Sequence, residues 1–251
     1  MFDLKGRVAV VTGASGGLGR QFALALAGQG ADIALLARRA QKMEEVAAEI
    51  RAKGVKCLVL ATDVTDSSHV TEAVKAVMNE YRKVDILVNN AGGGYSAPLE
   101  ELADENWRDT ISLDVDGVFY CTREFGREML KAGYGRVINI ASILGKGGLV
   151  ELPIIVYATA KGAVINFTRQ AAAEWATKGV TVNAICPGFF PSQANNPEAM
   201  DAMNDFIVAN TPMRRPGADG ELDSTLVFLA ADESTYVTGS IVTCDGGWTC
   251  V

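Results

Sequence analysis

Tyr157 and Lys161 stand four positions apart in a stretch with helical periodicity. A spacing of four places two side chains on one face of a helix, within reach of each other. A free tyrosine, with a pKa of about 10, exchanges protons poorly at neutral pH, and a neighbouring ammonium lowers that pKa by favouring the phenolate. The pair is therefore a candidate acid–base group, although taken alone the spacing fits two solvated surface side chains better.

A glycine-rich turn follows the first apolar run of the chain. Its residues are Thr12-Gly13-Ala14-Ser15-Gly16-Gly17-Leu18-Gly19, and a helical pattern begins at its end. Glycines allow a backbone to approach a pyrophosphate closely, and a helix N-terminus offers free N–H groups and a partial positive charge. The spacing differs from the GxGxxG fingerprint, so a tight turn that needs glycine only for packing is the structural alternative.

Two guanidinium groups, Arg38 and Arg39, come directly after the second apolar run, Ile33 to Ala37. An acidic residue at this point typically binds the ribose 2′-hydroxyl of a dinucleotide, whereas an Arg accommodates a 2′-phosphate. No acidic residue is present here, and guanidinium groups form charge-assisted contacts with phosphate. The sequence therefore favours NADP(H) over NAD(H), the alternative being two solvated charges at a helix start.

The elements that must position these groups follow a regular alternation. Short apolar, β-branched runs predict strands at 8–12, 33–37, 57–61, 86–89, 137–142, 180–186 and 241–244, and amphipathic patterns predict helices at 18–27, 41–52, 70–81, 106–131, 157–178 and 221–231. Continuously apolar strands joined by helices must be buried on both faces. We predict one α/β domain over residues 1–251: a doubly wound, Rossmann-type fold with a seven-stranded parallel sheet and helices on both faces. Residues 188–217 show no such pattern and are expected to form an irregular lid or binding loop.

The composition excludes several classes of function. The formal net charge of −7 opposes general attraction to nucleic acid or anionic lipid. No apolar run reaches the roughly 18 residues of a membrane span, and Asp3 and Lys5 interrupt the start of the chain. Five cysteines without a CxxC pair, and His69 as the single histidine, supply neither a disulfide framework nor a zinc cage. We predict a cytoplasmic protein with no metal, no nucleic-acid partner and no membrane partner.

Several motifs, in order along the chain, resemble those of the short-chain dehydrogenase/reductase family of the common cytoplasmic type. They are the TGASGGLG turn, which resembles the family's TGxxxGxG; Asp63-Val64, its adenine-contacting pair; Asn89-Asn90-Ala91-Gly92, its NNAG; Tyr157 to Lys161, its YxxxK; Pro187-Gly188, its nicotinamide-contacting turn; and Asp245-Gly246-Gly247, its usual ending. The resemblance spans essentially the whole chain. It is greatest to the gluconate 5-dehydrogenase-like branch, through the opening FDLKGRVAVVTG and the ending DGGW.

The resemblance implies a mechanism and a set of site residues. Ser142 would hydrogen-bond the substrate oxygen, Tyr157 would pass a proton to or from it, and Lys161 would hold the nicotinamide ribose and lower the tyrosine pKa. The implied reaction is reduction of a carbonyl with NADPH, or the reverse oxidation of a secondary alcohol. The residues expected to bind the cofactor are Gly13, Ser15, Gly17, Leu18, Gly19, Arg38, Arg39, Asp63, Val64, Asn90, Ala91, Gly92, Tyr157, Lys161, Pro187, Gly188 and Phe190.

The chain departs from the family pattern at two places. Asp114 stands where the family usually has a catalytic Asn, whose main-chain carbonyl holds a water linked to the lysine. A backbone role survives this change, whereas an extra carboxylate near Lys161 would alter the proton relay and the pH profile. The second departure is the gap from Ser142 to Tyr157, which is longer than usual and rich in glycine. Substrate specificity is expected there, with Lys146 and Glu151 read as solvated loop charges.

The sequence allows more than one substrate class and more than one oligomeric state. Ser142, Tyr157, Tyr95 and Phe189 are expected to contact the substrate, with Ser96 beside them. A keto-sugar acid or polyol is the first expectation, with hydroxysteroids and 3-ketoacyl thioesters as alternatives. The resemblance implies a homotetramer, and Trp175 and Trp248 suit subunit packing, although burial within one subunit explains Trp175 equally well. A monomer mass on gel filtration would contradict the tetramer.

Two rival classes of function remain beside the oxidoreductase. A non-catalytic dinucleotide sensor or scaffold would bind the cofactor without turnover, and the intact acid–base group argues against it. A dehydratase or epimerase that uses bound cofactor without net redox change would form product with no change in nicotinamide absorbance. Asp114 is the feature that favours this last reading.

Overall fold

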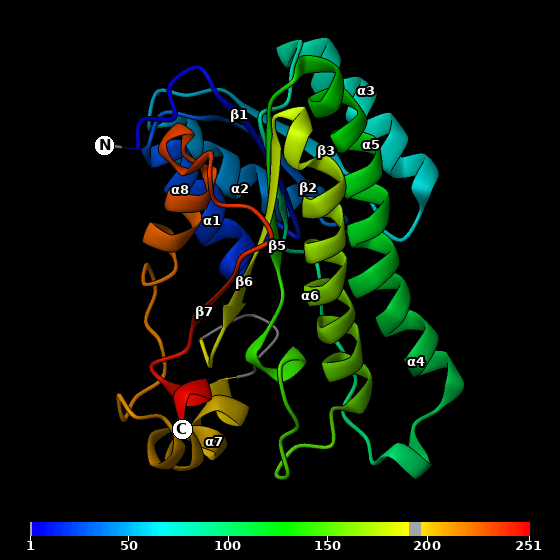
Figure 1. The fold of residues 1–251 in the computed structure, drawn as a ribbon, viewed down its shortest axis with the longest axis vertical. Coiled ribbons are helices and arrows are strands. Elements are labelled where there is room, and N and C mark those ends of the chain that lie inside the picture. The colour runs from blue at the N-terminus through cyan, green and yellow to red at the C-terminus, as the bar shows by residue number, and fades with distance from the viewer. Residues whose placement is uncertain (1, 191–196) are drawn as a thin grey trace.

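The computed structural model describes residues 2–190 and 197–251 and has one parallel sheet of seven strands (Figure 1). The strands are β1 (Val8–Thr12), β2 (Asp32–Ala37), β3 (Cys57–Ala61), β4 (Ile86–Asn89), β5 (Gly135–Ile140), β6 (Val180–Pro187) and β7 (Ile241–Cys244). Their spatial order is β3-β2-β1-β4-β5-β6-β7, and every neighbouring pair is parallel. The predicted doubly wound fold is confirmed.

Helices cover both faces of the sheet. They are α1 (Gly17–Gly28), α2 (Ala40–Arg51), α3 (Ser67–Tyr81), α4 (Asp104–Ile111), α5 (Gly117–Ala132), α6 (Ile155–Trp175), α7 (Pro197–Asn210) and α8 (Asp223–Ala230). Phe22 of α1, Met43 of α2 and Leu226 of α8 belong to one core cluster, while Phe125 of α5 and Ala171 of α6 belong to another on the opposite face. The central strands are buried on both sides, which explains why their sequences are continuously apolar.

The strand order reverses direction at β1, whose neighbours are β2 and β4. At this switch point the loops after β1 and β4 leave the sheet toward opposite faces, which opens a crevice between them. Buried amides tie the adjoining strands together: Asn89 Nδ2 donates to Asn139 Oδ1 at 2.8 Å, and Asn139 Nδ2 donates to Thr168 Oγ1 at 2.9 Å. These bonds join β4 to β5 and β5 to α6 (Ile155–Trp175) beside the crevice.

The structure corrects the helix predicted over 106–131. It consists of α4, a π-helical turn over Ser112–Asp116, and α5. A π turn inserts an extra residue and re-aims the side chains on it, which a 3.6-residue periodicity does not reveal. Asp114 lies on this turn and is fully buried.

The prediction of an irregular segment over 188–217 is wrong in part, because α7 occupies Pro197–Asn210. The signal was present in the sequence: proline is favoured at the first position of a helix, and Met203, Phe206 and Ile207 repeat at helical spacing. The many prolines around the helix obscured it. In the part of the chain that the structure describes, no helix has the length and apolar character needed to cross a membrane.

Candidate active site

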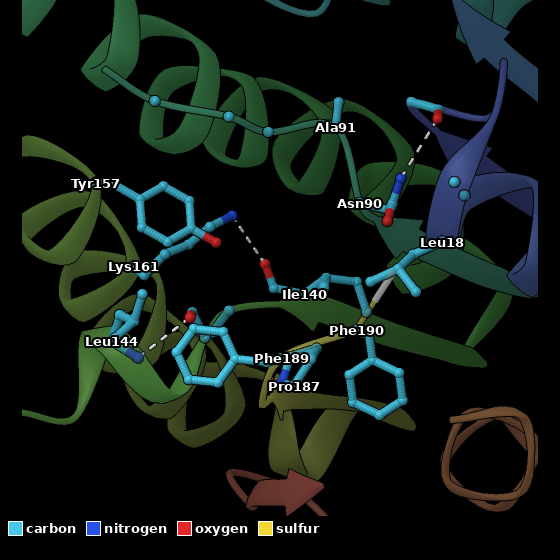
Figure 2. A pocket seen from close by; sticks show the side chains of 18 of the residues that line it. Leu18, Asn90, Ala91, Ile140, Leu144, Tyr157, Lys161, Pro187, Phe189 and Phe190 are labelled. Carbon is cyan, nitrogen blue, oxygen red and sulfur yellow. Dashed lines mark hydrogen bonds between the residues drawn. The ribbon is translucent and has the colours of Figure 1, made fainter. Parts of the chain in front are cut away.

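A cavity of about 540 Å³ opens where the loops after β1, β4, β5 and β6 meet (Figure 2). Parallel strands deliver all these loops to the same edge of the sheet, so residues far apart in sequence converge there. The predicted site residues that line the cavity are Gly13, Ser15, Gly17, Leu18, Gly19, Arg39, Asn90, Ala91, Gly92, Tyr95, Ser142, Tyr157, Lys161, Pro187, Gly188, Phe189 and Phe190.

Four predicted residues do not line this cavity. Arg38 is exposed, beside the lining residue Arg39. Asp63 accepts hydrogen bonds from the backbone and hydroxyl of Thr65 at 3.0 and 2.8 Å, and Val64 is buried. Asp114 is fully buried and contacts Lys161, which does line the cavity.

The glycine turn fits a diphosphate. Helix α1 begins after Gly16 with no side-chain cap, so its first N–H groups are left for another acceptor. Gly13 has a φ of +65°, and a Cβ on Gly19 would lie 2.4 Å from the Gly13 carbonyl oxygen. The turn thus admits no side chains at these positions and exposes an uncapped helix N-terminus to the cavity, as a bound pyrophosphate requires.

A hydrogen-bond clasp joins the ends of β1 and β4. Thr12 Oγ1 accepts from the backbone N–H groups of Asn90 and Ala91, both at 2.9 Å. Asn90 Nδ2 donates to the Thr12 carbonyl oxygen at 2.9 Å. These contacts give the NNAG motif a structural role, because they hold the glycine turn and the loop after β4 at a fixed separation.

Ser142 lies two residues beyond β5 and caps a short 3-10 helix, Ile143–Gly145. Its Oγ accepts a hydrogen bond from Leu144 N at 3.1 Å, and its hydroxyl proton remains available for a second partner. A Cβ on Gly145 would lie 2.5 Å from the Lys161 carbonyl carbon, so the glycine allows this loop to pack closely on α6. Ser142 on this loop and Tyr157 on α6 therefore line the cavity from two segments that are packed together.

Lys161 forms a buried ion pair with Asp114. Lys161 Nζ lies 2.9 Å from Asp114 Oδ2, with the two side chains 5% and 0% exposed. The ammonium also donates to the Ile140 carbonyl oxygen at 3.1 Å, and Asp114 Oδ1 accepts from Gly93 N at 2.8 Å. The side-chain carboxylate thus contacts the lysine directly, which is the contact that the second of the two roles weighed for Asp114 requires.

The loop after β4 closes over this pair. A Cβ on Gly92 would lie 2.9 Å from Lys161 Nζ, and one on Gly94 would lie 2.9 Å from Tyr157 Cβ. Lys161 Nζ is 5.4 Å from the centroid of the Tyr157 ring, so the ammonium and the phenol share one wall of the cavity. Glycines at 92 and 94 are needed because the loop backbone touches both side chains.

The pKa of Lys161 reflects a balance between burial and charge. Burial by itself would lower it, but the attraction of Asp114 and of Tyr157 outweighs that effect and raises the pKa above its ordinary value of 10.5. Lys161 is therefore a permanent ammonium at physiological pH, and its positive charge faces Tyr157 on one side and a carboxylate on the other.

Several residues that line the cavity were not among the predicted site residues, and two of them come from separate segments. Gly94 lines it beside Tyr157, and Met203 reaches it from α7. The tryptophans considered for subunit packing have partners within the chain: Trp248 packs edge-on against Phe189 at 4.8 Å, and Gly126 leaves room for the Trp175 ring. Both rings thus have contacts within one chain, and both are partly exposed.

The ion pair gives a test of stability. Asp114→Asn keeps the shape but leaves a buried ammonium without its counter-charge, so we expect the free energy of unfolding at pH 7 to fall by about 3 kcal/mol. In the parent, the raised pKa of Lys161 keeps its stabilisation intact below pH 10.5 and loses it only above. In the variant that pKa falls, so the deficit relative to the parent shrinks between pH 7 and pH 10.

Urea denaturation at both pH values measures this deficit. Asp116→Asn, on the same π turn but without the Lys161 contact, is the control and is expected to change stability by less than about 1 kcal/mol. A deficit in Asp114→Asn that is absent at pH 7, or that grows with pH, would contradict the charge argument.

Comparison with known proteins agrees with this geometry. The family model for short chain dehydrogenases matches residues 7–202. The chain is 38% identical over 240 residues to a 3-oxoacyl-(acyl-carrier-protein) reductase of Staphylococcus epidermidis, covering 95% of this chain and 97% of the relative. It is 35% identical over 250 residues to a gluconate 5-dehydrogenase of Gluconobacter oxydans, covering 99% and 97%.

Solved structures show the same likeness. A gluconate 5-dehydrogenase from Burkholderia cenocepacia, in complex with NADP and tartrate, superposes with a TM-score of 0.94 at 34% identity, covering 100% of this chain and 98% of that one. An NAD+-bound xylitol dehydrogenase superposes with a TM-score of 0.90 at 31% identity, covering 97% and 99%. The chain belongs to the short-chain dehydrogenase/reductase family of oxidoreductases.

Proposed function

We propose that the protein interconverts a carbonyl compound and a secondary alcohol with NADP(H). The observation that carries this proposal is convergence: the uncapped glycine turn and the Ser142, Tyr157 and Lys161 side chains all line one cavity. A dinucleotide site without acid–base groups would serve a sensor, and acid–base groups without the turn would need no nicotinamide. Their presence together favours redox chemistry.

Bound NADPH supplies the hydride that reduces the carbonyl carbon. Tyr157 donates its phenolic proton to the carbonyl oxygen during reduction and accepts it back during oxidation. Ser142 donates its hydroxyl proton in a hydrogen bond to the same oxygen and so fixes its position. Lys161 stabilises the phenolate that remains on Tyr157, and Asp114 holds the lysine in place.

The residues that line the cavity also suggest where each part of the cofactor would bind. The diphosphate would lie on Gly13 to Gly19, and the nicotinamide would lie near Tyr157, Lys161 and the Pro187-Gly188 turn. Asn90, Ala91 and Gly92 would line the path between them. Asp63 and Val64 are retained as a proposed adenine contact, supported by the family resemblance rather than by the shape of the cavity.

A preference for NADP(H) rests on Arg39 in particular. Its Nη2 donates to Ser15 Oγ at 3.0 Å, which places the guanidinium at the rim of the glycine turn. Among the relatives, the Burkholderia enzyme was solved with NADP and the xylitol dehydrogenase with NAD+, so the family accommodates both. We assign the 2′-phosphate contact to Arg39, with Arg38 as a more distant charge.

We also propose candidate substrate classes and an oligomeric state. Relatives named for gluconate and for 3-oxoacyl substrates support the keto-sugar acid and 3-ketoacyl expectations, while a hydroxysteroid rests on no relative described above. A homotetramer is retained as a proposal, supported by half-exposed aromatic residues, Trp107 on α4 and Phe119 on α5.

Removal of the phenolic hydroxyl tests the reaction. In Tyr157→Phe the ring still packs against Gly94, but no proton can be donated, so turnover is expected to fall by a factor of about 100 or more. NADPH affinity, measured by fluorescence titration, is expected to stay within about threefold. Tyr120→Phe, the same change outside the cavity, serves as the control. Full activity in Tyr157→Phe would refute the assigned proton donor.

The cofactor preference is tested with a matched pair of arginine variants. Arg39→Ala removes the guanidinium that lines the cavity, so NADPH affinity is expected to fall at least tenfold, about 1.4 kcal/mol, while NADH affinity changes less than about twofold. Arg38→Ala, one residue away, is expected to have a smaller effect on NADPH. Equal losses for NADPH and NADH in Arg39→Ala would exclude a 2′-phosphate contact at this residue.

A further inference from the structure

We infer that the substrate is an uncharged, largely apolar carbonyl compound, and not a sugar acid. This inference rests on the proposed function and narrows it to a substrate class. Its basis is the charge and polarity of the cavity wall that lies beyond the Ser142 and Tyr157 hydroxyl groups.

Apolar side chains dominate this part of the wall. They are contributed by four different segments, namely Tyr95, Leu144, Leu152, Ile154, Phe189 and Met203. The hydroxyl of Ser96 also lines the cavity, but it donates to the Pro153 carbonyl oxygen at 3.2 Å. Among the described residues of this wall the Tyr95 phenol is the other side-chain hydroxyl, so the several hydroxyl groups of a sugar or polyol would lose water here and find few partners in return.

The two basic residues that line the described part of the cavity already have partners within the chain. Among the described residues that line the cavity, Arg39 and Lys161 carry positive charge. Arg39 lies at the glycine turn and donates to Ser15. Lys161 is buried, donates to the Ile140 carbonyl oxygen and pairs with Asp114 at 2.9 Å. Since the carboxylate already neutralises the ammonium, neither cation is placed to receive an anionic substrate group.

The basic residues of the flanking segments are engaged as well. Lys146 donates to Thr243 Oγ1 at 2.8 Å, and Arg215 forms a bidentate pair with Glu221 at 2.6 and 2.7 Å. Arg214 donates to the carbonyl oxygen of Ala209. In sequence, residues 93–104 contain three acidic residues and no Lys or Arg.

An anionic substrate group would thus meet no free counter-charge among the described residues that line this wall, and residues 93–104 carry a surplus of negative charge. A buried carboxylate needs a charged or strongly hydrogen-bonding partner, because the loss of hydration is otherwise uncompensated. An uncharged ketone loses little on entering the same wall and gains contact with its aromatic and aliphatic side chains. The ketone oxygen would still reach Ser142 and Tyr157.

Two ketones of matched shape test this inference: 4-methylcyclohexanone and 4-oxocyclohexanecarboxylate, which differ in a methyl or a carboxylate group. At pH 7 with NADPH, kcat/KM for the methyl compound is expected to exceed that for the carboxylate at least tenfold. The Kd of each ketone for the protein–NADPH complex, measured through NADPH fluorescence, is expected to follow the same order. Equal or better use of the carboxylate, or no measurable binding of the methyl compound, would overturn the inference.

The binding measurement separates this inference from the proposed reaction. If the methyl ketone binds more tightly than the carboxylate but neither is reduced, the proposed reaction fails while the charge argument stands. If both are reduced and the carboxylate is preferred, the reaction stands and the charge argument fails.

A variant with an added charge tests the cause. Leu152, half-buried on the wall, is changed to Arg, with Leu152→Gln as a neutral control of similar length. Leu152→Arg is expected to shift the ratio of kcat/KM values at least tenfold toward the carboxylate, whereas Leu152→Gln shifts it by less than about threefold. The same shift in both variants would show that bulk, not charge, governs the preference.

Discussion

The ion pair between Lys161 and Asp114 constrains the rest of the site. Two opposite charges are held 2.9 Å apart with almost no exposure to solvent, and further hydrogen bonds to the same two side chains help to offset their lost hydration. Those bonds come from β5, through the Ile140 carbonyl, and from the loop after β4, through the Gly93 N–H. The pair therefore fixes α6, the π turn, β5 and this loop relative to one another, and it sets the position of Tyr157 one helical turn away.

This constraint divides the cavity into two chemically different parts. One part, built from the glycine turn and Arg39, offers free N–H groups and a positive charge, which suit a phosphorylated dinucleotide. The other part has mainly apolar walls, and the cations near it, Lys161 and Lys146, already form an ion pair or a hydrogen bond within the chain. Tyr157 and Ser142 line the cavity as well, and the proposed reaction would bring a nicotinamide and a carbonyl carbon together beside them.

Much of this arrangement could be predicted from the sequence. The seven strands were readable because each is buried on both faces and therefore continuously apolar, and parallel strands bring their following loops to one edge. The ion pair was less accessible, because the π turn that carries Asp114 interrupts a helical pattern without a break in polarity. Helix α7 was hidden among prolines, and the difference between Arg38 and Arg39 depends on side-chain direction, which spacing does not encode.

The central claim is that hydride passes between a nicotinamide and a carbonyl carbon in this cavity, and isotope transfer tests it directly. The protein would be supplied with 4-methylcyclohexanone and NADPH deuterated at C4 of the nicotinamide, each C4 epimer in turn, and the alcohol analysed by mass spectrometry. The account predicts one deuterium on the carbinol carbon from one epimer and none from the other. Alcohol without deuterium from either epimer, or cofactor binding with no alcohol formed, would contradict it.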